Sequence, residues 1–128
     1  MHLQFFHVDD LCRFMDILLE KKPQEHIFNV GNPESLDVNT WVSLCYQAAG
    51  KELTVVPVYS SHAQRNYFPF YDYEYALDVT KQREWMPETI PLPEGLKESF
   101  QWYLRHSDSV NKKPYLEYID QYLNTVTA

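Results

Sequence analysis

The sequence predicts an α/β protein, because short apolar segments alternate with segments of helical periodicity along most of its length. The clearest change of period lies near the start, where the apolar, aromatic segment 3–8 ends at Asp9 and Asp10 and a helical pattern follows. A second apolar segment spans 26–30, and a third, at 52–58, contains the letters TVVPV. The first two predict a strand–helix–strand unit, whose crossover is right-handed if its strands are parallel.

The helix expected after Asp10 has signals at both of its ends. A carboxylate at Asp9 or Asp10 suits the free amide groups of a helix N-terminus, while Lys21 and Lys22 suit the C-terminus, which Pro23 ends. The expected apolar face consists of Leu11, Phe14, Met15 and Leu18. Two adjacent aspartates also have the composition of a general acid–base site, but helix capping explains them with fewer assumptions.

Four further helices are expected downstream. Asp37 caps the first of them, which ends at Gly50, and a short capped helix covers 78–85. The last two begin at Pro93 and Pro114, because proline is favoured in the first turn of a helix. Their apolar side chains recur at helical spacing, which predicts one buried face on each helix.

The composition of the 128-residue chain fits one globular core, with 45% hydrophobic and 16% aromatic residues. The net charge of −7 argues against broad electrostatic attraction to nucleic acid or to an anionic membrane. No apolar run reaches membrane-spanning length, and no leader pattern precedes the first strand. Cys12 and Cys45 fall on predicted apolar helix faces, which favours buried free thiols and a cytoplasmic location.

Sequence motifs for cofactor, metal or nucleophilic chemistry are absent. The three glycines, Gly31, Gly50 and Gly95, cannot build a dinucleotide fingerprint or a phosphate-binding loop. No tyrosine precedes a lysine by four residues, and the histidines do not fall at metal-ligand spacing. His7 lies beside two aspartates, as a site residue would, but a structural histidine is the simpler interpretation. We therefore predict no catalytic, cofactor-binding or metal-binding residue in this chain.

The least regular part of the chain is the segment 59–76, which is expected to form one long loop. Its seven aromatic residues are Tyr59, Tyr67, Phe68, Phe70, Tyr71, Tyr73 and Tyr75. A loop this long is uncommon in a compact domain unless it is functional or disordered, and the aromatic content argues against disorder. Arg65, its only arginine, could bind a phosphate while the rings stack on a base. An exposed arginine, in a loop whose rings cover a hydrophobic face, is the alternative, and both interpretations stay open.

Six short motifs occur in a familiar order: FFHVDDL, FNVGN, AAGKE, VVPV, DVTKQREWMP and EGLKESFQWYL. Together they resemble the C-terminal half of the extended short-chain dehydrogenases/reductases, the NAD(P)-dependent sugar-nucleotide epimerases and dehydratases. The resemblance covers about residues 5–103. The segment FPFYDYEYA and the helical tail after Lys113 further resemble a subgroup that includes the chloroplast stem-loop RNA-binding proteins.

Individual positions match the pattern of this family. They are Val8, Asp10, Asn29, Gly31, Asp78 and Lys81. Arg65 lies where the family often places an arginine that binds the nucleotide diphosphate of the substrate, although RNYFPF replaces the usual arginine-proline-glycine-aspartate. The resemblance therefore implies a nucleotide-binding set of Arg65, Tyr67, Phe68 and Tyr71.

The resemblance implies that the chain is a small mixed α/β C-terminal portion of such an enzyme, lacking most of the Rossmann sheet. Residues 1–107 would be the substrate-binding region and 108–128 a helical extension. The full-length parent would bind NAD or NADP and a sugar nucleotide, whereas this segment would bind no cofactor and would not be catalytic alone. Its expected partners are the missing N-terminal Rossmann half and a second copy, paired through the uncovered strand 26–30. The alternative is a non-catalytic binding module related to the chloroplast stem-loop RNA-binding proteins.

Overall fold

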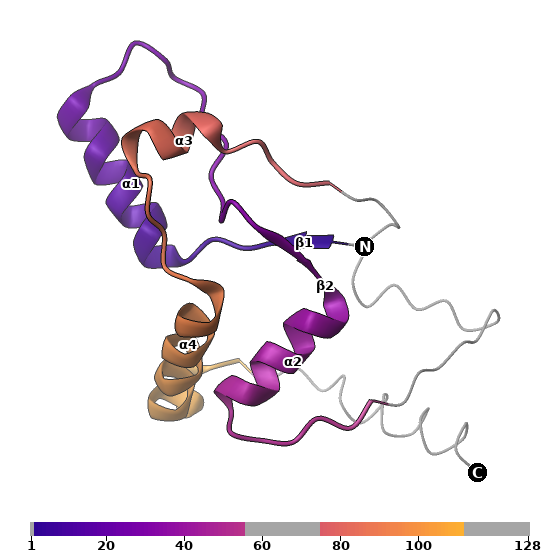
Figure 1. Ribbon diagram of the computed structural model, residues 1–128. Coiled ribbons are helices and arrows are strands. Elements are labelled where there is room, and N and C mark those ends of the chain that lie inside the picture. The colour runs from indigo at the N-terminus through magenta and orange to yellow at the C-terminus, as the bar shows by residue number, and fades with distance from the viewer. Residues whose placement is uncertain (1, 56–74, 112–128) are drawn as a thin grey trace.

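The computed structural model describes residues 2–55 and 75–111, which form a small mixed α/β arrangement (Figure 1). The elements are β1 (His2–Gln4), α1 (Val8–Lys21), β2 (Ser35–Asp37), α2 (Val38–Ala48), α3 (Thr80–Trp85), α4 (Leu92–His106) and the 3₁₀ helix η1 (Ser107–Ser109). The α/β class is therefore confirmed at this level. Over the described ranges, no helix has both the length and the apolar character needed to cross a bilayer.

The sheet consists of β1 and β2, which pair antiparallel with Leu3 opposite Leu36. The prediction of a strand at 26–30 is wrong, because this segment is irregular and pairs with neither strand of the described part of the chain. The parallel unit expected from that strand is absent from the described part of the chain. The strand expected at 52–58 is likewise not formed over 52–55, and 56–58 lie outside the described residues.

Helix α1 begins earlier than expected, and its cap is a histidine rather than an aspartate. The Nδ1 atom of His7 accepts a hydrogen bond from the Asp9 amide at 3.3 Å. The helix ends as predicted before Pro23, with Lys22 in the left-handed conformation at φ 47°. Phe14, which is 1% exposed, anchors the helix and meets Phe28 edge to face with ring centroids 5.5 Å apart. Of the expected apolar face, Leu11 and Met15 are exposed.

Helix α2 has the cap that the sequence predicts. Asp37 Oδ1 accepts a hydrogen bond from the Thr40 amide at 3.0 Å, and Oδ2 accepts one from the Thr40 hydroxyl at 2.6 Å. Gly50 follows the helix with φ 65°, a conformation that glycine adopts without strain. Phe5 stacks on Trp41 with centroids 5.5 Å apart, which holds α2 against the segment that follows β1.

The C-terminal helices pack against the two earlier ones. Figure 1 shows α3 beside α1 and α4 beside α2, in agreement with the contacts between these pairs. The N-cap residue of α3 is Val79, which has no side-chain capping bond. Asp78 lies just before it, and its Oδ1 accepts hydrogen bonds from the Thr80 amide at 2.9 Å and the Thr80 hydroxyl at 2.6 Å. Helix α4 starts one residue before Pro93. The helix expected from Pro114 lies outside the described residues.

The two cysteines are free thiols, as predicted, but neither is fully buried. Cys12 is exposed, because α1 turns only its other face toward the core. Cys45 is partly covered on α2, and this burial raises the pKa of its thiol.

Candidate functional site

The predicted nucleotide-binding set belongs to the aromatic segment, and the structure describes the residues that follow this segment in the chain. Arg65, Tyr67, Phe68 and Tyr71 lie outside the described residues. The chain returns from this segment at Leu77, whose amide donates to Gln4 Oε1 at 2.7 Å and whose carbonyl accepts from Gln4 Nε2 at 3.2 Å. Asn29 Nδ2 donates to the Asp78 carbonyl at 3.1 Å. These bonds fix the chain at 77–78.

Gln82 on α3 holds the residue that follows the segment 26–30. Its Oε1 accepts a hydrogen bond from the Gly31 amide at 2.7 Å, and its Nε2 donates to the Gly31 carbonyl at 3.1 Å. Both residues are buried. The side-chain amide therefore satisfies both backbone groups of Gly31 in place of a neighbouring strand.

Asp10 is a buried structural carboxylate, not a helix cap. Its Oδ2 accepts a hydrogen bond from the Ile90 amide at 2.6 Å, and its Oδ1 forms an ion pair with Arg13 Nη2 at 3.0 Å. Arg13 also donates to the Glu88 carbonyl at 2.5 Å and to Met86 Sδ at 3.3 Å. This arrangement ties α1 to the connector between α3 and α4. Both oxygens of Asp10 have partners and the residue is 1% exposed, so a substrate cannot come within hydrogen-bond reach of this carboxylate.

Five of the positions that match the family pattern thus take part in long-range bonds. They join the segments near the start of the chain to residues 77–90, and they are Asp10, Asn29, Gly31, Asp78 and Lys81, the last of which pairs with Glu25. The side chains that bond at or beside these positions include those of Gln4, Arg13 and Gln82. The sequence does not reveal them, because an isolated glutamine or arginine belongs to no periodic pattern and to no motif of fixed spacing. Only the placement of the helices identifies their roles.

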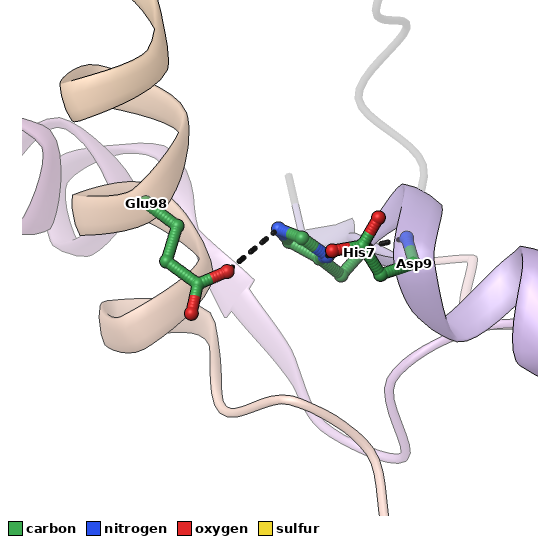
Figure 2. Close-up of side chains that lie close together, drawn as sticks. All are labelled: His7, Asp9 and Glu98. Carbon is green, nitrogen blue, oxygen red and sulfur yellow. Dashed lines mark hydrogen bonds and ion pairs between the residues drawn. The ribbon is translucent and has the colours of Figure 1, made fainter.

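A second candidate site lies where α1 begins and α4 passes, and it brings together His7, Asp9 and Glu98. In Figure 2, Glu98 extends from α4 toward the ring of His7. The distance from His7 Nε2 to Glu98 Oε2 is 3.7 Å, and that from His7 Nδ1 to Asp9 Oδ2 is 3.8 Å. The His7 side chain is only 14% exposed, whereas both carboxylates are well exposed.

Gly95 explains how the His7 ring reaches this position. A Cβ atom at Gly95 would lie 2.8 Å from His7 Cδ2, so the imidazole packs where any other residue would place a side chain. Glycine inside a helix costs about 1 kcal/mol relative to alanine. Besides the position of His7 next to Asp9, Gly95 in a helical pattern is therefore a sequence signal for this site.

A groove with a volume of about 860 Å³ opens beside the cluster. All three cluster residues line it, together with the exposed ring of Trp102 and the guanidinium-bearing Arg105. Trp102 stacks on His106 with ring centroids 4.6 Å apart, which holds the indole against α4. The groove gives a small molecule or ion access to the cluster from solvent.

The hydrogen bonds of His7 define what the cluster can do chemically. Because Nδ1 accepts from the Asp9 amide, the proton of the neutral ring is on Nε2, which faces Glu98. A protonated ring would face a carboxylate on each side. The imidazole nitrogen and two carboxylates are also a donor set that transition-metal ions accept. The capping bond agrees with the structural role expected for His7, and the approach of Glu98 adds a charged partner.

Comparison of the chain with protein-family models, curated proteins and solved structures finds no match.

Proposed function

We propose that this chain is the substrate-binding C-terminal portion of an NAD(P)-dependent sugar-nucleotide epimerase or dehydratase of the extended short-chain dehydrogenase/reductase type. The observation that carries the proposal is that the matched motif residues converge: Asp10, Asn29 and Gly31 bond to the chain on the C-terminal side of the aromatic segment. Residues 77–78, which follow the aromatic segment, are bonded to Gln4 and Asn29, and loops held by such a scaffold often carry binding residues.

Within this proposal, Arg65 pairs with the diphosphate of the substrate and the rings of Tyr67, Phe68 and Tyr71 stack on the base. A guanidinium group suits this role because its planar donors match phosphate oxygens in pairs. Aromatic rings add stacking energy that depends little on the identity of the base. The cofactor, NAD or NADP, belongs to the N-terminal Rossmann half of the parent enzyme.

Exposed apolar residues support a partner surface of the kind that a missing half or a second copy would cover. On α1 they are Val8, Leu11, Met15 and Leu19, which recur along one face of the helix. Ile27 is 81% exposed, and the backbone of 26–30 makes no hydrogen bond to another described residue. Exposed apolar patches and unpaired backbone both favour association.

The second candidate function is a non-catalytic binding module related to the chloroplast stem-loop RNA-binding proteins. Arg65 among aromatic rings also suits single-stranded RNA, whose bases stack on such rings. The net charge of −7 disfavours it, because phosphate contacts dominate affinity for nucleic acid.

The genomic sequence upstream of the region that encodes this chain distinguishes the enzyme proposal from the binding-module proposal. The enzyme proposal predicts an in-frame strand–helix pattern with a glycine-rich fingerprint and a tyrosine four residues before a lysine. An upstream Rossmann half that lacks both would contradict the enzyme proposal and favour the binding module.

A further inference from the structure

We propose that His7, Asp9 and Glu98 bind a divalent transition-metal ion of the zinc class where the groove opens between the start of α1 and α4. The inference rests on the described side chains alone and does not depend on the sugar-nucleotide proposal. The sequence gives no metal-binding spacing, because Glu98 comes from a helix far along the chain. Only folding brings the three donors together (Figure 2).

The separations between the donors suit an ion better than direct hydrogen bonds. The 3.7 Å between His7 Nε2 and Glu98 Oε2 exceeds the length of a hydrogen bond, whereas the 3.8 Å to Asp9 Oδ2 is measured from Nδ1, the other ring nitrogen. Two ligand atoms that each lie about 2.1 Å from a metal are about 3.7 Å apart when they subtend an angle near 120°. The separation of His7 Nε2 and Glu98 Oε2 already has this value.

The third ligand needs only a small movement. One donor atom from each residue lies within 4.8 Å of the other two. Two bonds of about 2.1 Å at a tetrahedral angle place their ligand atoms about 3.4 Å apart, so closure requires a shift of no more than about 1.4 Å. Asp9 and Glu98 are well exposed, and neither carboxylate has another partner among the described residues. Their rotamers can therefore change without breaking other bonds.

The histidine is the fixed member of the set. Its ring lies against the bare backbone of Gly95, on a helix that bears Glu98 one turn further on. A ligand that is held in place before binding loses less conformational entropy when the metal binds. The cluster thus combines one ordered nitrogen ligand with two adaptable oxygen ligands.

The donor set selects the class of metal. Magnesium and calcium prefer sites made of oxygen ligands, whereas an imidazole nitrogen with carboxylates suits zinc and its neighbours in the first transition row. Three protein ligands leave a tetrahedral ion one position for water, which can enter from the groove that all three residues line.

Binding requires a change of tautomer in His7. The free ring carries its proton on Nε2 because Nδ1 accepts from the Asp9 amide. When Nε2 binds the metal, the proton moves to Nδ1 and the Asp9 amide loses its acceptor. No net proton leaves a ring that was neutral. The tautomer therefore reports binding at this ring directly.

The test is to titrate zinc chloride into the full, ¹⁵N-labelled chain near neutral pH. Calorimetry measures the binding, and imidazole ¹⁵N spectra report the tautomer of His7. We expect one zinc per chain and a switch of His7 from the Nε2–H to the Nδ1–H tautomer. Glu98→Gln should weaken binding about ten-fold or more, because it removes a charged ligand. Glu94→Gln is the matched control. Glu94 lines the same groove from the same helix but lies outside the cluster, and its substitution causes the same change of charge.

Two results would overturn the proposal. The first is a His7 ring whose ¹⁵N signals do not move at millimolar zinc. The second is an equal loss of affinity in Glu98→Gln and Glu94→Gln, which would indicate general attraction to an acidic surface. Circular dichroism of both variants excludes loss of folding as the cause.

Discussion

The side-chain amide of Gln82 forms both hydrogen bonds that a neighbouring strand would otherwise give to Gly31. We expect Gln82→Glu to destabilise the chain by about 1–3 kcal/mol, because it keeps the shape but removes the donor to the buried Gly31 carbonyl. Urea unfolding of the variant and of Gln47→Leu, an exposed glutamine on α2, provides the measurement and its control.

The stability of the Gln82→Glu variant should also depend on pH. Burial raises the pKa of a carboxyl group above its value in the unfolded chain. Its protonated form can donate to Gly31, so the stability difference from the wild type should shrink as the pH falls and grow as the pH rises through the folded-state pKa. A difference that is constant with pH would contradict the proposed role of the lost donor.

The link between α1 and the connector depends on Asp10. Asp10→Ala leaves the partly buried Ile90 amide without its acceptor and Arg13 without its ion pair, so the free energy of unfolding should fall by about 1–3 kcal/mol. Asp16→Ala, an exposed aspartate on the same helix, should change it by less than about 0.5 kcal/mol. Equal effects in urea unfolding would show that the Asp10 bonds contribute little.

The hydrogen bonds that cap α2 should affect the pKa of Asp37. The hydroxyl of Thr40, followed by its amide, holds the pKa of Asp37 below its ordinary value. A carboxyl group with a lowered folded-state pKa stabilises the fold above its unfolded pKa, and this contribution disappears as the pH falls through the folded value. In Thr40→Val the pKa of Asp37 should rise, as measured by carboxyl ¹³C shifts.

Asp78 is the internal control for this titration, because the hydroxyl of Thr80 lowers its pKa in the same way. Its pKa should not change in Thr40→Val. An unchanged midpoint for Asp37 would mean that the hydroxyl of Thr40 is not the cause of its shift.

Self-association through 26–30 is best tested at Ile27. Phe28 is half-buried against Phe14, so Phe28→Lys would damage the core as well as any interface. We expect a dimer mass by light scattering at high protein concentration, a shift toward monomer in Ile27→Lys with unchanged circular dichroism, and no shift in Glu20→Lys. A wild-type chain that stays monomeric at every concentration would contradict this proposal.

Local signals in the sequence predict the helices well. Asp37 and Asp78 each meet a threonine that lies close in the sequence, and Gly50 and Pro23 act within one turn of the helix that they follow. Their effects depend on neighbours within a few residues. The α/β class and most helix boundaries could therefore be predicted.

Long-range placement could not be predicted in the same way. The apolar pattern at 26–30 fits a strand, but a strand also needs a partner, and the residues that pair with β1 lie at 35–37 instead. Gln82 and Glu98 act through contacts that only the packing of α3 and α4 creates. The nucleotide-binding set around Arg65 stays a prediction.

The most direct test of the proposed function is an amide-shift titration of the full chain with UDP- and GDP-sugars, with NAD and NADP as control ligands. The account predicts shifts between Tyr59 and Tyr75 with the sugar nucleotides and none with NAD or NADP. Arg65→Ala should abolish them, because a charge-assisted phosphate contact contributes about 1.5–3 kcal/mol. Arg105→Ala, a matched arginine on α4, should leave them unchanged. Shifts that persist in Arg65→Ala, or binding of NAD in place of the sugar nucleotides, would contradict the account.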